Sequence, residues 1–176
     1  MYALTGIDTV ISTVSGTSQL ALIEAAVRCG CRRFVPSEFS GPPARRPLED
    51  AIESAKTETL DRLRYYAGQI ESTVFVCGIF YERFAPGGMG ALGLGLGSGI
   101  SGEGDYVLDM RNFHAEIPSH DREGREVHVS MTSAQDVARF VVRALDFAHW
   151  PLELWMQGDR MSVWNLVMEA EAIRGL

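Results

Sequence analysis

The stretch that decides the fold is Arg33-Phe34-Val35-Pro36-Ser37-Glu38-Phe39. Its first three residues predict a short buried strand, because Phe34 is aromatic and Val35 is β-branched. Pro36 cannot donate a hydrogen bond to a neighbouring strand, so we expect the strand to end there. Ser37–Phe39 then lies at the carboxyl end of the strand, the edge at which open α/β sheets bind ligands. The stretch therefore predicts a buried strand followed directly by a binding edge.

The segment before this stretch predicts a strand and a helix. Thr9–Val14 is β-branched and almost continuously apolar, which is typical of a strand covered on both faces. A Ser-Gly break follows, and we expect Thr17 or Ser18 to cap a helix over residues 19–28. Together with the strand at Arg33–Val35 these elements have the length of a right-handed parallel crossover.

The rest of the chain continues the alternation of helices and strands. The helices are expected over residues 48–67, 134–147 and 163–174, and the strands over residues 73–77, 105–109, 126–131 and 153–156. We expect a turn at Gly158-Asp159-Arg160 and a helix cap at Ser162. The pattern predicts a three-layer α/β fold with a parallel sheet and helices on both faces. We expect one domain over residues 1–176, with a core at 1–85, a glycine-rich loop at 86–104 and a remainder at 105–176.

Composition and charge exclude several classes of function. The formal net charge is −7, which argues against a nucleic-acid surface because phosphate contacts need clustered Lys and Arg. No apolar run reaches the length of a membrane span, and no signal peptide is evident. The odd number of cysteines, at positions 29, 31 and 77, predicts reduced thiols in a cytoplasmic protein. No spacing of His and Cys predicts a metal site.

Half of the chain's 18 glycines lie within residues 86–104. This composition predicts a mobile loop that acts as a lid or stays poorly ordered. The loop contains two formal G-x-G-x-x-G patterns, which begin at Gly88 and Gly97. A dinucleotide fingerprint must leave a strand and open a helix, and neither pattern does, so we interpret both as chance matches.

Lys56 is the main candidate for a catalytic group. It is the only lysine in a chain with fifteen arginines, and lysine can lose its proton when partly buried whereas arginine cannot. Its expected helical neighbours Ile52, Ala55 and Leu60 are apolar, so we expect desolvation to lower its proton affinity. Lys56 would then serve as a general acid or base. The alternative is a surface lysine on an amphipathic helix.

The other titratable residues have simpler interpretations. No nucleophile elbow or catalytic triad is evident, and Ile52 stands where ordinary short-chain dehydrogenases carry the tyrosine of Tyr-x-x-x-Lys. We expect helix-cap or turn roles for Asp136 and Asp159. Surface or packing roles are expected for the histidines, which are His114, His120, His128 and His149.

The chain resembles the NmrA-like and isoflavone-reductase-like family, atypical short-chain dehydrogenases on a Rossmann sheet, and most of all its fungal branch. The resemblance spans nearly the whole chain. The matching segments are residues 4–14, 33–39, 56, 78–80, 136–140, 150–151 and 158–162. The resemblance implies a truncated Rossmann-like sheet and an NADPH-dependent reductase of a small aromatic or polyketide-type molecule, as in secondary metabolism, or a cofactor-sensing regulator.

The resemblance also implies roles for individual residues. Lys56 matches the family's catalytic lysine. The positions implied for the cofactor NADP(H) are Thr13, Val14, Ser15, Ser37, Glu38, Phe39 and Lys56. The positions implied for the substrate are Gly78, Ile79, Phe80 and Tyr81.

One departure from the family pattern leaves alternatives open. The family's glycine-rich turn, which cradles the pyrophosphate at a helix N-terminus, lies upstream of the part matched here. We therefore expect NADP(H) binding to be weak or lost. The alternatives are a non-redox isomerase or cyclase that reuses the pocket without nucleotide, and a non-catalytic regulatory module. The edge at Thr9–Val14 would lack its neighbouring strand, which predicts a homo-oligomer.

Overall fold

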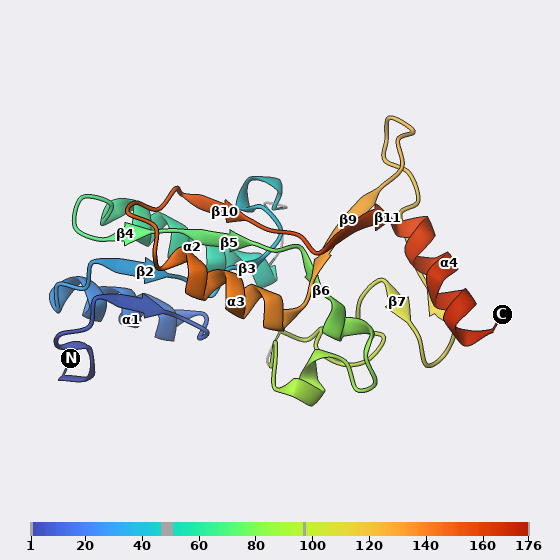
Figure 1. Ribbon diagram of the computed structural model, residues 1–176, viewed down its shortest axis with the longest axis horizontal. Coiled ribbons are helices and arrows are strands. Elements are labelled where there is room, and N and C mark those ends of the chain that lie inside the picture. Colours follow the sequence, from blue (N-terminus) through green and yellow to red (C-terminus); the bar gives the residue numbers. More distant parts are fainter. Residues whose placement is uncertain (1, 47–50, 97, 176) are drawn as a thin grey trace. The chain divides into compact units, whose positions relative to one another are not determined.

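The computed structural model describes residues 2–46, 51–96 and 98–175 of the chain (Figure 1). These residues form two compact units. The first unit consists of Met1–Val76 and Val141–Trp155, and the second of Cys77–Phe140 and Met156–Leu176. The single domain expected over residues 1–176 stays a prediction.

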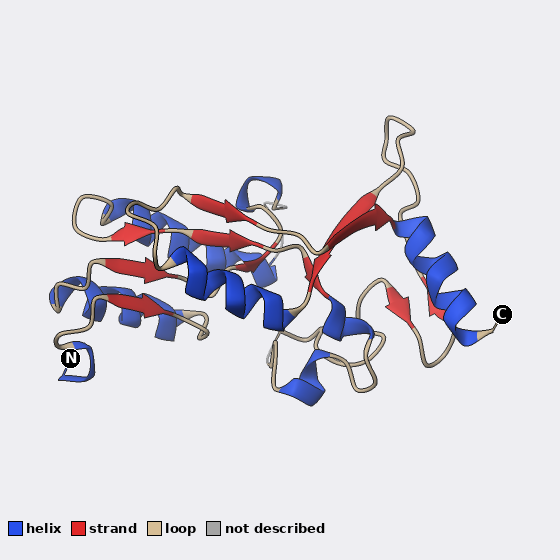
Figure 2. Ribbon diagram, viewed as in Figure 1, coloured by secondary structure: helices blue, strands red, loops and turns tan. Residues whose placement is uncertain are grey.

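The first unit contains two three-stranded sheets in which every pairing is parallel (Figure 2). One sheet has the order β1-β2-β4, with strands Thr9–Ile11, Arg33–Val35 and Glu71–Ser72. The other has the order β10-β5-β3, with strands Glu153–Trp155, Val74–Val76 and Phe39–Ser40. Only Thr73 separates β4 from β5, so one continuous chain segment contributes to both sheets.

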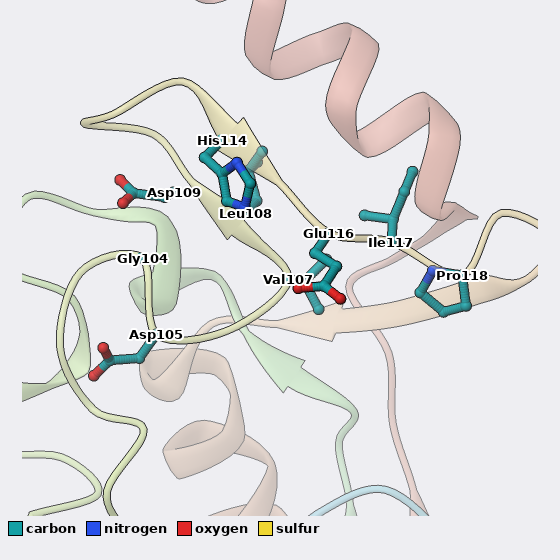
Figure 3. Close-up of a pocket in the computed structure, with 9 residues that line it drawn as sticks. All are labelled: Gly104, Asp105, Val107, Leu108, Asp109, His114, Glu116, Ile117 and Pro118. Carbon is teal, nitrogen blue, oxygen red and sulfur yellow. The ribbon is translucent and has the colours of Figure 1, made fainter.

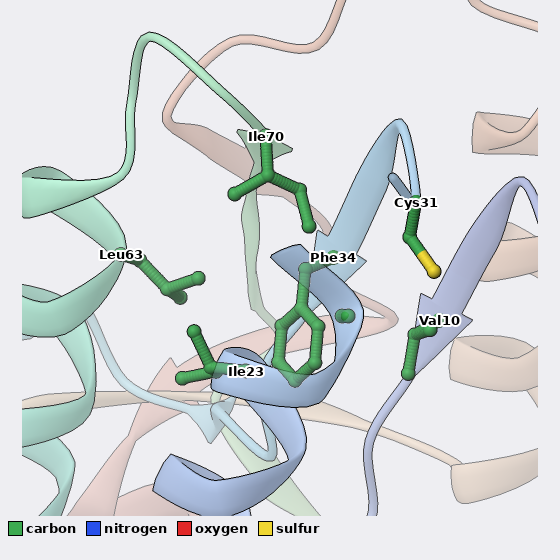
Figure 4. Close-up of a cluster of buried hydrophobic side chains, with 7 residues drawn as sticks. Val10, Ile23, Cys31, Phe34, Leu63 and Ile70 are labelled. Carbon is green, nitrogen blue, oxygen red and sulfur yellow. The ribbon is translucent and has the colours of Figure 1, made fainter. Parts of the chain in front are cut away.

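The two faces of β2 pack against different parts of the first unit. Phe34 belongs to a buried cluster with side chains of α1 (Thr17–Arg28) and α2 (Ala51–Tyr65), shown in Figure 4. Successive side chains of a strand point to opposite faces, so Arg33 points the other way. It bonds the carbonyls that follow α3 (Ala134–Ala144). The α/β class predicted from the sequence is therefore confirmed.

The Arg33 guanidinium is the most heavily bonded buried group that the structure describes in the first unit. Its side chain is 2% exposed and its Nε lies 2.6 Å from a carboxylate oxygen of Glu71. The terminal nitrogens donate to three carbonyl oxygens at 2.6–3.1 Å, those of Leu145, Phe147 and Ala148. The guanidinium carbon also lies 4.6 Å from the ring centre of Trp150. One buried cation thus fastens the segment after α3 to β2 and β4.

The second unit is built on a mixed sheet of order β11-β9-β6. Its strands are Asp159–Ser162, His128–Thr132 and Ile79–Phe80, with β9 antiparallel to β11 and parallel to β6. Leu108–Asp109 (β7) and His114–Ala115 (β8) form a separate hairpin. Helix α4 (Val163–Arg174) closes the core, which contains Leu108, Met131, Leu166 and Ala170.

Both units also contain short 3-10 helices and buried thiols. The 3-10 helices are Tyr2–Leu4 and Pro43–Arg45 in the first unit, and Tyr81–Phe84 and Met89–Leu92 in the second. Cys31 and Cys77 are buried, and no disulfide joins the three cysteines. No helix in the described part of the chain is long and apolar enough to cross a bilayer. The cytoplasmic location stays a prediction.

Several predicted boundaries and caps were wrong. The strand expected over residues 9–14 ends at Ile11, and the strand expected over 105–109 is reduced to its last two residues. Helix α1 begins after Gly16 with no side-chain cap, so neither Thr17 nor Ser18 has the predicted role. The turn expected at residues 158–160 is wrong because Asp159 opens β11. The helix expected from residue 48 is described from Ala51, and residues 48–50 lie outside the description.

Two predicted caps are confirmed. Ser162 accepts a hydrogen bond from the backbone N–H of Asn165 at 3.2 Å and caps α4. Ser133 accepts one from Asp136 at the start of α3, and Asp136 in turn accepts the hydroxyl proton of Ser133. The helix-end role expected for Asp136 is thereby confirmed.

Replacing Arg33 by Met should destabilise the first unit strongly. The substitution keeps a long side chain but leaves Glu71 and three carbonyls without their cation, at a cost of about 3 kcal/mol. Arg32→Met is the matched control, because Arg32 pairs with Asp8 on the surface and both side chains are more than half exposed. Thermal unfolding followed by circular dichroism should show a clear loss of stability for Arg33→Met and almost none for Arg32→Met. Equal losses of stability would contradict the structural role of Arg33.

Protonation of the Glu71 carboxyl should lower the free energy of unfolding at acidic pH. Burial opposes its ionisation, but the hydrogen bonds from Trp150 N–H and Arg33 outweigh burial and hold its pKa below 4.5. A depressed pKa contributes stability that is fully present above the unfolded value and is lost as pH falls through the folded value. Denaturant unfolding should therefore show that the free energy of unfolding falls less with decreasing pH in Glu71→Gln than in wild type. Parallel curves would contradict this.

Candidate functional site

The turn that follows β2 is held by backbone and side-chain bonds. The Ser37 N–H donates to Oε1 of Gln19 at 2.5 Å, and the Glu38 N–H donates to the Pro36 carbonyl at 2.7 Å. Pro36 ends β2 as predicted, because the strand stops at Val35. The turn therefore has a defined shape at the carboxyl end of a parallel strand.

Glu38 does not present its carboxylate to solvent. Its Oε2 lies 2.6 Å from the Arg46 guanidinium, and the two side chains are 1% and 8% exposed. Arg46 belongs to the loop that contains the 3-10 helix Pro43–Arg45. The ion pair thus fastens that loop to the turn, a role that the sequence did not predict. The cofactor role assigned to Glu38 stays a prediction.

Lys56 lies on α2 and is partly buried. Thr59, three residues further along the same helix, is fully buried and accepts a hydrogen bond from Nε2 of Gln19 at 3.1 Å. Of the apolar neighbours expected around Lys56, Leu60 is half-buried, while the side chains of Ile52 and Ala55 lie outside the description. One buried amide therefore links Lys56's helix to the Ser37 turn. No local pattern in the sequence indicates the role of Gln19, because its partners are 18 and 40 residues away.

Thr13, Val14 and Ser15 form the loop between β1 and α1. All three are exposed, and Val14 is 45% exposed despite its apolar side chain. The loop is anchored by the buried Ser12, whose hydroxyl donates to the Val14 carbonyl at 3.2 Å. The three residues thus lie at the carboxyl end of β1, beside the first turn of α1. They belong to the first unit, as do Ser37–Phe39 and Lys56.

The residues predicted for the substrate lie in the second unit. Gly78 has a φ of +71°, and a Cβ there would lie 2.0 Å from the Ser130 carbonyl oxygen. Ile79 and Phe80 form β6, and Ile79 packs against the buried cluster around Met131. Gly78 is therefore required for β6 to approach β9, which is a structural role independent of any ligand.

Tyr81 has a partner that the sequence did not predict. Its hydroxyl donates to Oδ2 of Asp159 at 2.5 Å. Burial and this hydrogen bond raise the pKa of Tyr81 to about 12, so the phenol stays protonated at neutral pH. A turn role was expected for Asp159; the structure instead places its carboxylate at the start of β11, on the tyrosine hydroxyl.

The glycine-rich segment has defined internal bonds. Gly90 N–H donates to the Ser101 carbonyl at 2.7 Å, and the Arg83 guanidinium donates to the Ile100 carbonyl at the same distance. Residues 88–93 surround the short 3-10 helix Met89–Leu92, which agrees with their interpretation as a chance G-x-G-x-x-G match. The second match includes Gly97, which lies outside the described residues. The mobility of the segment stays a prediction.

A pocket of about 520 Å³ lies beside this segment in the second unit (Figure 3). Its lining includes none of the residues predicted for the cofactor or the substrate. Two of its carboxylates already accept backbone bonds, Asp105 from Gly102 and Asp109 from Arg111 and Asn112. Hydrogen bonds from Asn112 lower the pKa of Asp109. In the described part of the chain, no group of His, Cys, Asp and Glu residues could hold a metal ion.

Comparison with known proteins supports the resemblance seen in the sequence. No protein-family model matches the chain. An oxidoreductase of Botryotinia fuckeliana, BOA1, is 29% identical over 171 residues, which is 94% of this chain and 51% of that protein. The chain thus spans about half the length of the curated relative it matches.

Solved structures show the same fold. The complex of leucoanthocyanidin reductase with NADPH from Vitis vinifera matches 96% of this chain and 51% of that chain, with a TM-score of 0.62 and 19% identity. The pinoresinol-lariciresinol and phenylcoumaran benzylic ether reductases match 99% of this chain and 55% of theirs, with a TM-score of 0.65 and 18% identity. The predicted likeness to isoflavone-reductase-like reductases is confirmed as a shared fold.

The close approach at Gly78 can be tested against a second glycine. Gly78→Ala should cost about 3 kcal/mol or more, because the methyl group would overlap the Ser130 carbonyl. Gly93→Ala is the matched control, since Gly93 has a similar φ of +69° but no atom within 4 Å of the added Cβ. It should cost only the backbone strain, about 1 kcal/mol. Chemical denaturation measures both, and equal losses would contradict the steric role of Gly78.

Proposed function

We propose that this chain is an NAD(P)H-dependent reductase-type protein that acts on a small aromatic or polyketide-type molecule, with Lys56 as general acid or base. One observation carries the proposal. The helix that bears Lys56 is linked through Thr59 and Gln19 to the turn at the carboxyl end of β2. The oxidoreductase relative and the fold shared with NADPH-bound leucoanthocyanidin reductase also support a reductase-type function.

The residues of the first unit suit the nicotinamide side of a cofactor site. The loop after β1 is exposed and polar at a strand end, where such folds bind ligands. The Glu38 carboxylate pairs with Arg46, so it would also hold the shape of the turn. We propose that the cofactor is lined by Thr13, Val14, Ser15, Ser37, Glu38, Phe39 and Lys56.

The cofactor, when bound, would supply a hydride to the substrate. Lys56 would hold a proton close to the substrate atom whose charge changes in that step, and would donate or accept it as general acid–base catalysis requires. Arg could not replace it in this role, because a guanidinium does not release its proton near neutral pH. The turn at Ser37–Phe39 would fix where the reacting groups lie relative to the lysine amine.

We expect nucleotide affinity to be weak. In the described part of the chain, no strand runs into a helix through the glycine-rich turn that cradles a pyrophosphate. The turn between β1 and α1 contains the single glycine Gly16. The chain would then bind the nicotinamide end of the cofactor without the glycine-rich turn that binds the pyrophosphate.

The substrate side is proposed to involve Gly78, Ile79, Phe80 and Tyr81. Because the Tyr81 proton is directed to Asp159, the phenol oxygen keeps lone pairs that can accept a hydrogen bond. A pKa of about 12 keeps this arrangement unchanged across the physiological range. Tyr81 would thus favour a ligand that offers a hydroxyl or N–H group.

Substitution of Lys56 tests the catalytic role. Lys56→Ala should lower turnover about a hundredfold or more, and Lys56→Arg should fail nearly as badly. Arg64→Ala is the control on the same helix, because Arg64 is exposed and its ion pair with Asp61, three residues away, is local. The assay follows NADPH absorbance with a panel of aromatic and polyketide-type carbonyl compounds.

The outcomes separate the proposed reaction from the other candidate functions. Full activity of Lys56→Ala would leave Lys56 as a surface residue and overturn the mechanism. Turnover of the panel without nucleotide would favour an isomerase or cyclase. NADPH binding measured by fluorescence at submicromolar affinity would contradict the expected weak binding.

We further propose that the chain forms a homo-oligomer through the edge of β1. Strand β1 is the outer strand of its sheet, and Ile11 on it is 41% exposed. An unpaired edge with exposed apolar side chains is a template for pairing with another strand. Light scattering should show a dimer or larger species, and Ile11→Lys should dissociate it. A strictly monomeric wild type over a roughly hundredfold dilution would contradict the proposal.

A further inference from the structure

Gln19 is a buried polar residue to which neither the sequence nor the comparisons assign a role. It lies in the first turns of α1 and is 1% exposed. Its amide uses both ends: Oε1 accepts the Ser37 N–H at 2.5 Å, and Nε2 donates to the Thr59 hydroxyl oxygen at 3.1 Å. A buried amide with both ends bonded is costly to displace, because each lost partner leaves a desolvated group.

These two bonds join three elements of the first unit. They link α1 to the turn after β2 and to α2, which carries Lys56. Lys56 and Thr59 are three residues apart, so they lie on the same side of α2. A shift or rotation of α2 that moved Lys56 would also break the bond between Gln19 and Thr59.

The orientation of the amide is determined by its partners. Ser37 offers a backbone N–H, which only the carbonyl oxygen of the amide can accept. The NH₂ end must then face Thr59, whose oxygen accepts while its own proton is left for another acceptor. An apolar side chain of the same length could fill the space but could not fix the rotation of α2.

We propose that Gln19 is a positioning residue for Lys56, fixing the lysine-bearing helix onto the turn that follows β2. This inference rests on the proposed function for its consequence in catalysis. Its structural part, the control of Lys56 by Gln19, can be tested without a substrate.

The test uses the fact that Lys56 is the only lysine. Acetic anhydride labels Lys56 and the α-amine, and mass spectrometry of peptides gives the two rates, with the α-amine as internal reference. Gln19→Met and Thr59→Val are close in size to the native residues and remove the bonds. Thr59→Ser keeps the hydroxyl and tests rescue. Gln135→Met is the control, because Gln135 is an exposed glutamine on α3.

We expect Gln19→Met and Thr59→Val each to change the labelling rate of Lys56 by about threefold or more. The double variant should show no further change, since both substitutions break one connection. Thr59→Ser and Gln135→Met should match the wild type. The folded state of each variant is checked by circular dichroism.

An unchanged Lys56 rate in folded Thr59→Val overturns the inference, whether or not Gln19→Met folds. A changed rate in Gln135→Met or Thr59→Ser also overturns it, because the effect would then not depend on this connection. Failure of the proposed function gives a different result: Lys56→Ala would keep full turnover while Gln19→Met and Thr59→Val still altered Lys56 labelling.

Discussion

The first unit depends on a buried cation that the fold must satisfy. Arg33 is the first residue of the three-residue strand β2, whose other two residues are apolar, and an unpaired buried charge there would be prohibitively costly. The Arg33 guanidinium contacts one carboxylate, three carbonyl oxygens and the face of the Trp150 ring. These partners come from β4 and from the segment after α3, so satisfying Arg33 brings distant parts of the sequence together. The strand that precedes the candidate site is therefore fixed in position before any ligand binds.

The opposite face of β2 and the turn after it position the candidate site. Phe34 packs against α1 and α2, and the turn immediately after β2 is bonded to both helices through Gln19. The Glu38–Arg46 ion pair adds a third connection, to the loop before α2. Buried polar groups of this kind specify one arrangement when every member is bonded. The placement of the helix that carries Lys56 thus depends on several buried bonds rather than on a single motif.

The sequence predicted the parts of this architecture that depend on local patterns. The strand at Arg33–Val35 ends at a proline, and α4 begins at a serine cap, because both signals lie within a few residues of the element they define. The role of Gln19 could not be predicted, because nothing local distinguishes a bonded buried glutamine from an exposed one. The turn predicted at Asp159 is wrong because the strand that Asp159 opens is defined by antiparallel pairing with β9, which is distant in the sequence.

The three tryptophans give the two units different optical signals. Trp150 is 7% exposed, its ring faces the Arg33 cation, and its indole N–H donates to the Ala144 carbonyl. Trp155, also in the first unit, and Trp164, in the second, are 59% and 55% exposed. Solvation of exposed indoles changes little on unfolding, whereas Trp150 moves from a dry cationic environment into water. Intrinsic fluorescence therefore reports chiefly on the first unit, and the second unit needs a separate spectroscopic probe.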